Sequence, residues 1–165
     1  MTDTVRTPAV AARIEELFLA VHELRRIHPD NRTDADRRNH VEFIRELEPL
    51  LALPPAGYAL PKAATRLIDH AKANGWKPYV QWFCQADDGP WVTVQVSRLL
   101  APAEAAHRRS NRWTYSISWH SRYCAPGRVR LFGRVLARTP DHPVTHYVPS
   151  LKAVRAVITA NPTAP

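Results

Sequence analysis

The feature that most constrains this chain is a pair of strand-like runs on either side of a short turn. Residues 77–85 and 91–98 alternate apolar and polar side chains, which is the pattern of a half-buried β-strand. The five residues between them read Ala-Asp-Asp-Gly-Pro and include the Asp-Gly pair typical of hairpin turns. The sequence therefore predicts an antiparallel hairpin whose inward side chains face a core.

Two more strands and two helices extend this hairpin. Residues 112–120 and 128–137 have the same alternation, and Ala-Pro-Gly at 125–127 predicts a turn between them. Residues 62–74 carry an apolar stripe of helical spacing that stops at Asn74-Gly75, and a last helix begins near Pro149 and Ser150. Residues 62–161 are thus predicted to form an α-β-β-β-β-α domain with a four-stranded antiparallel sheet.

Residues 8–48 predict an antiparallel helical hairpin. The first helix shows apolar residues at alternating spacings of four and three, and Thr33 is suited to cap the second helix. We expect Pro49 to end that second helix, and residues 49–61, with four prolines and a glycine, to form a semi-rigid linker. The second helix is expected to bury Val41, Phe43, Ile44 and Leu47. The predicted fold class is therefore α+β.

Charge is distributed unevenly along the chain. Residues 1–60 carry 8 Arg and Lys against 10 Asp and Glu, a net charge of −2. Residues 61–165 carry 15 Arg and Lys against 5 Asp and Glu, a net charge of +10. Such a basic domain is typical of proteins that bind a polyanion, although a need for solubility alone is the alternative explanation.

The outward face of the predicted sheet combines arginines with large aromatic rings. Sheets that bind single-stranded nucleic acid use rings to stack bases and arginines to hold phosphates. In the alternative, the helical hairpin covers this face, and Tyr79, Phe83, Trp91 and Phe132 form a second core layer. The candidate nucleic-acid-binding residues are Trp91, Arg112, His120, Arg122, Arg128, Arg130, Phe132 and Arg134.

Histidine and cysteine spacing gives a weak indication of a metal site. His120-x3-Cys124 and His142-x3-His146 have the spacing of zinc ligands, but the usual double-cysteine knuckle is missing. We therefore expect neither a metal nor a cofactor.

Catalytic motifs are equally weak. Cys84 has the parity of the inward face, where a buried thiol is unreactive, and Cys124 has His120 nearby without a third group to orient the histidine. The basic domain is poor in acids, and the chain, with five glycines, has no Gly-rich phosphate loop. No catalytic residue is assigned, and an enzyme ranks below two binding hypotheses.

The C-terminal part of the chain contains three short motifs: Ser-Trp-His at 118–120, Arg-Leu-Phe at 130–132 and Pro-Ser-Leu-Lys-Ala-Val-Arg at 149–155. In these motifs the chain resembles a set of small actinobacterial proteins. This resemblance implies a family but no activity. The order of helix, strands and helix also resembles a double-stranded-RNA-binding domain, whose lysine-rich helix start is absent here.

Two hypotheses of function follow. The first is a nucleic-acid-binding accessory protein whose basic sheet domain binds DNA or RNA. The second is a protein–protein adaptor whose basic face meets an acidic partner and which dimerises through the helical hairpin. With no apolar run of about 20 residues and no apolar core near residue 1, we expect a cytoplasmic protein without a membrane span.

Overall fold

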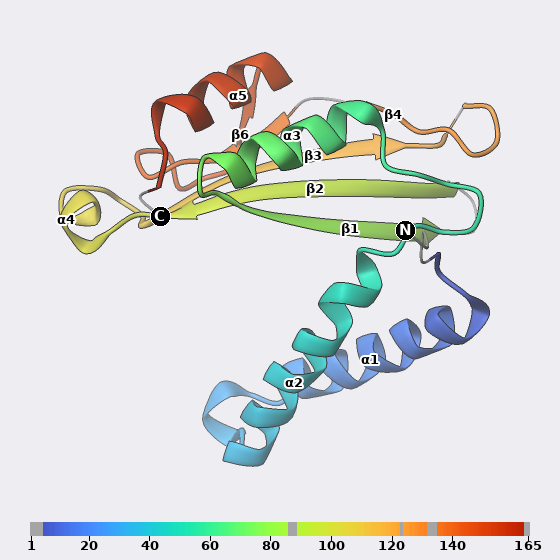
Figure 1. The fold of residues 1–165 in the computed structure, drawn as a ribbon. Coiled ribbons are helices and arrows are strands. Elements are labelled where there is room, and N and C mark those ends of the chain that lie inside the picture. The colour runs from blue at the N-terminus through green and yellow to red at the C-terminus, as the bar shows by residue number, and fades with distance from the viewer. Residues whose placement is uncertain (1–4, 86–88, 123, 132–134, 164–165) are drawn as a thin grey trace. The chain divides into compact units, whose positions relative to one another are not determined.

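The computed structural model of the protein describes residues 5–85, 89–122, 124–131 and 135–163. The chain divides into two compact units, Met1–Gly57 (unit 1) and Tyr58–Pro165 (unit 2). Unit 1 is helical, and unit 2 contains an antiparallel sheet with helices (Figure 1). The fold class is therefore α+β, as the sequence predicts.

Unit 1 consists of α1 (Pro8–Arg26), the 3-10 helix η1 (Pro29–Asn31) and α2 (Asp34–Leu51). Thr7 and Thr33 cap the starts of α1 and α2 with their side-chain oxygens. The two helices run antiparallel, because Arg13 near the start of α1 pairs with Glu46 near the end of α2 at 2.7 Å. Their small shared core contains Ile14, Leu17, Leu47 and Leu51.

Two details of the predicted second helix are wrong. Pro49 does not end α2, which continues to Leu51, because in the last turn a proline removes only one hydrogen bond close to the helix end. Val41 is 54% exposed and not buried. It lies six residues before the buried Leu47, about 240° around the helix, and so falls outside the stripe that meets α1.

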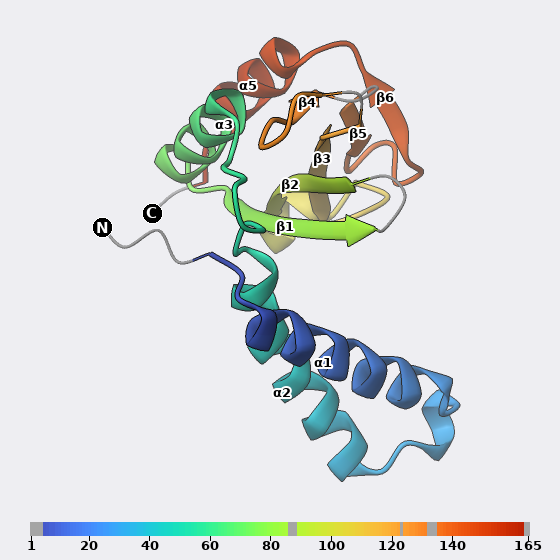
Figure 2. The same ribbon diagram turned by 90° about the vertical axis from the view of Figure 1, so that its right-hand side faces the viewer.

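Among the described residues, unit 2 contains α3 (Lys62–Ala73), β1 (Lys77–Gln85), β2 (Gly89–Leu99), α4 (Pro102–Ala105), β3 (Arg112–His120), β4 (Arg130–Leu131), β5 (Val135–Arg138), β6 (His146–Val148) and α5 (Leu151–Ala160). The strands pair antiparallel in the order β1-β2-β3-β5-β6, and β4 pairs with β3 outside this path. Helices α3 and α5 lie side by side on one face of the sheet (Figures 1 and 2).

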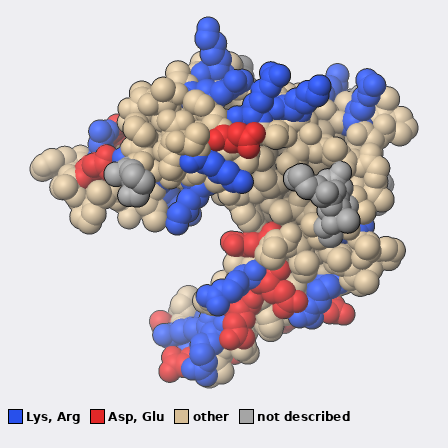
Figure 3. Space-filling view, in the orientation of Figure 1, with Lys and Arg blue, Asp and Glu red and all other residues tan. Residues whose placement is uncertain are grey.

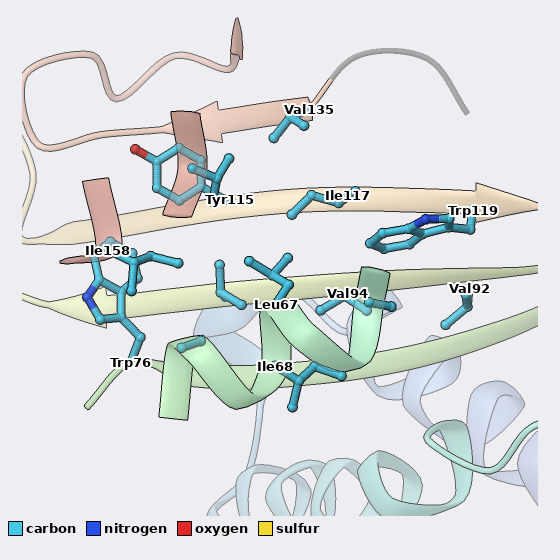
Figure 4. Packing of buried hydrophobic residues seen from close by; sticks show 14 of the residues in the cluster. Leu67, Ile68, Trp76, Val92, Val94, Tyr115, Ile117, Trp119, Val135 and Ile158 are labelled. Carbon is cyan, nitrogen blue, oxygen red and sulfur yellow. The ribbon is translucent and has the colours of Figure 1, made fainter. Parts of the chain in front are cut away.

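The core of unit 2 lies between these two helices and the sheet. Leu67 and Ile68 of α3 belong to the same buried cluster as the inward residues of β2 and β3, and Trp76 packs at one end of this cluster (Figure 4). The indole Nε1 of Trp113 donates to the Tyr115 hydroxyl at 3.0 Å. Burial raises the pKa of this tyrosine, since removal from water disfavours the phenolate.

The predicted four-stranded sheet is wrong in number, because six strands are present among the described residues. The single predicted strand at 128–137 corresponds to β4 and β5, and residues 132–134 between them lie outside the described residues. Strand β6 has three residues, too few for an alternating pattern to reveal. The tip of the first predicted turn, residues 86–88, also lies outside the described part of the chain.

We predict that a fragment of residues 57–165 folds alone and unfolds cooperatively in urea, since the core of unit 2 is drawn from residues 58–158. A fragment that begins at Lys62 should have a lower midpoint. It lacks Tyr58 and Leu60, which pack against this core, and the Tyr58 ring lies 6.3 Å from the Trp82 ring. Tryptophan fluorescence follows the transition. A non-cooperative transition of the longer fragment would show that unit 2 depends on unit 1.

Candidate nucleic-acid interface

The face of the sheet opposite α3 and α5 is polar, and we call it the polar face. Paired residues on neighbouring antiparallel strands project to the same side, so the strand register fixes the members of this face. None of its described members is acidic. They are Lys77, Tyr79, Gln81, Phe83, Trp91, Thr93, Gln95, Ser97, Leu99, Arg112, Thr114, Ser116, Ser118, His120, Arg130, Leu136, Arg138 and Tyr147.

Three rings form a row across β1, β2 and β3 at one end of the polar face. Phe83 pairs with Trp91, and Trp91 pairs with His120. The Phe83 and Trp91 centroids are 4.9 Å apart with planes at 14°, and the Trp91 and His120 centroids are 5.5 Å apart at 3°. The rings therefore stack on one another, and both faces of the Trp91 ring are occupied by its neighbours. We call these three residues the aromatic row.

The row ends differently on its two sides. On one side, Arg130 of β4 is the register partner of His120 and is exposed. On the other side, Phe83 lies on β1, the first strand in the sheet order, and no strand among the described residues continues the row beyond it. Phe83 is thus the last ring of the row on this side, and the outer face of its ring is turned toward the edge of the sheet.

A pocket of about 420 Å³ opens at the other end of the polar face. Its charged lining consists of Arg112 and Arg138, and none of the ten described residues that line it is acidic. Its remaining lining comes from the polar face, from β5 and from the two loops nearby: Gln95, Ser110, Thr114, Ser116, Leu136, Ala137, Pro143 and Thr145. Two guanidinium groups without a carboxylate among the lining residues favour an anionic ligand.

Hydrogen bonds to two hydroxyl oxygens position the pocket arginines. Arg138 Nε donates to Thr145 Oγ1 at 2.9 Å, which ties its strand to the loop before β6. The backbone N–H of Arg112 donates to Ser110 Oγ at 3.1 Å. These bonds hold the start of β3 and the end of β5 against the loops that form the pocket wall.

The acidic residues of the loops beside the pocket form ion pairs with arginines that do not line it. Arg108 pairs with Asp141, which joins the loop after α4 to the loop after β5. Arg98, whose side chain is 8% exposed, pairs with Glu104 at 2.8 Å. The pKa of Glu104 is lowered by the backbone N–H of Ala101 and then by Arg98. The pocket wall is therefore built from loops whose acids are already matched by other arginines.

The predicted site residues reach different places. Arg112 lines the pocket, Trp91 and His120 belong to the aromatic row, and Arg130 lies beside His120. Arg122 and Arg128 lie exposed in the connection between β3 and β4. Phe132 and Arg134 lie outside the described residues.

Sequence reasoning missed several pocket residues. Arg138 has the same outward parity as Arg112 and follows the last predicted strand residue directly, so extending that strand by one residue would have found it. Ser110, Pro143 and Thr145 come from loops, where no periodic pattern marks a side chain as facing the sheet.

The cysteines do not behave alike. Cys84 is exposed, so the expectation that it is buried is wrong. It pairs with Pro90 beside the turn, whereas the buried cluster ends at Trp82 and Val92. Cys124 Sγ contacts the backbone oxygen of His120 at 3.6 Å. The structure records no disulfide for either cysteine, and no group of three metal-binding side chains is found within the described ranges.

A second basic surface covers the helices of unit 2. Figure 3 shows Lys and Arg side chains gathered over α3 and α5. Their sequences contain one acid, Asp69. We call this set the helix basic face: Lys62, Arg66, Lys72, Lys152 and Arg155. In contrast to the polar face, it offers charge without stacked rings, which suits a flexible acidic surface or a duplex backbone.

Comparison with known proteins identifies no relative: no protein-family model, no curated protein and no solved structure matches the chain. Within the described residues, no helix is long and apolar enough to cross a bilayer. The site is therefore assessed from its own geometry.

We predict that the protein purified without chelator contains no stoichiometric zinc by elemental analysis. His142 and His146 have ring centroids 5.5 Å apart, and neither joins a larger ligand group in the described chain. Cys124→Ser should leave the melting temperature nearly unchanged, with Cys84→Ser as the matched control. One zinc per chain, lost together with stability in Cys124→Ser alone, would overturn this expectation.

Proposed function

We propose that unit 2 binds single-stranded nucleic acid along its polar face. The observation that carries this proposal is the placement of stacked rings and an arginine-lined pocket at opposite ends of one acid-free face. From Thr114 to His120 the strand advances six residues, about 20 Å, which is the length of a few nucleotides. A strand lying along this line would meet rings at one end and guanidinium groups at the other.

The aromatic row supports a particular mode of base stacking. Because the Trp91 ring is covered on both faces, a base inserts beside it only if the row separates. The outer face of Phe83 needs no such change. We therefore assign the stacking contact to Phe83 and a supporting role to Trp91, which holds the Phe83 ring upright.

The cations at the two ends of the polar face fit the phosphate backbone. Lys77, Arg112, Arg130 and Arg138 are exposed cations of the polar face. Hydroxyl and amide side chains fill the space between them, and the hydroxyl oxygens of Thr93 and Ser118 are 2.9 Å apart. Such groups can hydrogen-bond to phosphate and sugar oxygens, and these contacts position a strand without reading its sequence.

The alternative function is an adaptor that binds an acidic protein. The helix basic face favours it, since α3 and α5 contribute five cations and a single carboxylate, Asp69. The two proposals use different faces of unit 2, so charge-neutralising variants on each face separate them.

We predict that binding to a single-stranded oligonucleotide weakens with salt at a log–log slope of about −3, as expected when four cations meet phosphates. Arg112→Gln should flatten the slope by about 0.7, because one contact is lost. Fluorescence anisotropy between 50 and 300 mM salt measures the slope at about 25 °C.

The matched control is Arg66→Gln, which removes the same charge from the helix basic face. It should leave the slope within error of the native value. If Arg66→Gln flattens the slope and Arg112→Gln does not, the polyanion binds over the helices. The absence of salt-dependent binding to either single or double strands would contradict nucleic-acid binding and favour the adaptor.

We predict that Phe83→Leu weakens single-strand binding by about 1–3 kcal/mol, because it removes the open stacking face while keeping an apolar side chain. Trp91→Phe should cost much less, since its ring faces contact protein and a phenyl ring preserves the row. Duplex binding should respond to neither change. An equal loss in both variants would show that bases enter the row itself.

A further inference from the structure

The pocket carries more positive charge than an internal phosphate supplies negative charge. Arg112 and Arg138 lie on neighbouring strands, because the register partner of Arg138 is Thr114, two residues from Arg112. Both line the same pocket, and the ten described lining residues include no carboxylate. A phosphodiester inside a strand carries one negative charge, whereas a phosphate monoester carries about −1.5 to −2 at pH 7. The pair of guanidinium groups therefore matches a monoester.

Two of the four hydroxyl groups that line the pocket can act as donors to a ligand. Thr145 Oγ1 accepts a hydrogen bond from Arg138 Nε, and Ser110 Oγ accepts one from the Arg112 backbone N–H. Since each oxygen already accepts a bond, its own hydrogen can be donated to a further acceptor. Phosphate monoesters present three such acceptor oxygens.

The size and the apolar part of the pocket indicate that the ligand is larger than inorganic phosphate. A volume of about 420 Å³ falls in the lower part of the range of small-molecule sites. Leu136, Ala137 and Pro143 contribute an apolar section of the lining. This section gives a sugar or a base a surface to pack against while its phosphate meets the arginines.

We infer that this pocket binds the phosphate monoester of a nucleotide. Two sources share this chemistry: the phosphorylated end of a nucleic-acid strand, and a free mononucleotide. The first source, the phosphorylated strand end, rests on the proposed function. It also fixes the direction of the bound strand, because a strand held by one end in the pocket then runs along the polar face toward the aromatic row. The second source stands independently of the proposed function.

The test compares decathymidylate that carries a phosphate at the 5′ end, at the 3′ end or at neither end, with the full-length protein. We expect one of the two phosphorylated ends to bind about tenfold more tightly than the unphosphorylated strand, the gain of about one charge-assisted hydrogen bond. In Arg138→Gln and Arg112→Gln this ratio should fall to less than threefold. Arg66→Gln should keep it, and all three variants should retain the native melting temperature.

A second arm titrates 5′-AMP, 3′-AMP and adenosine into the protein by calorimetry, with inorganic phosphate and acetate as competitors. A monophosphate that binds while adenosine does not, and whose binding is lost in Arg138→Gln, supports the inference. If mononucleotides bind but oligonucleotides do not, the pocket assignment stands and the proposed function is wrong.

A different result would contradict the pocket assignment and not the proposed function. Oligonucleotide binding with an equal gain from 5′ and 3′ phosphates, and with no mononucleotide binding, would reflect added charge alone. It would overturn the pocket assignment and leave the proposed function in place. Failure of every ligand to bind would overturn both.

Discussion

The position of Trp76 determines how the parts of unit 2 meet. Its ring is almost fully buried and stacks on Tyr115 of β3 at 6.0 Å, and its Nε1 donates to the backbone oxygen of Asn161 at 2.8 Å. One side chain at the α3–β1 corner thus contacts the central strand and the end of α5. Gly75 makes the corner possible: its φ is +74°, and a Cβ there would lie 1.9 Å from Thr163 Oγ1. This contact therefore ties the end of α3 and the end of α5 to the sheet.

Most of this architecture was predictable because the inward residues of long strands alternate regularly. Strands β1, β2 and β3 match their predicted ranges closely, since nine or more residues give a clear period of two. Prediction failed where the signal was short or where tertiary packing decided. Strand β6 is three residues long, and Val41 lies outside the stripe of α2 that meets α1.

The candidate site, like the fold, was predictable only in part. Outward parity identified Trp91, Arg112 and His120, because they lie on the long strands. It did not indicate that the Trp91 ring is enclosed between two others, since ring stacking depends on cross-strand register and on rotamers. The pocket could not be predicted from the sequence for a different reason. Its wall comes from loops, and Thr145 reaches Arg138 only once β5 and β6 have paired.

The two faces of the sheet contribute differently to the stability of the fold. The inward residues of β2 and β3, such as Val94 and Ile117, are fully buried and contribute the apolar area that stabilises the fold. Arg112 and Arg138, which project to the other side, are exposed and add little to that area. Substituting such residues changes the charge of the polar face at small cost in folding free energy. Among the described residues of the polar face, the fold requires neither the four cations nor the lack of acids, and this supports the proposal that the face binds an anionic ligand.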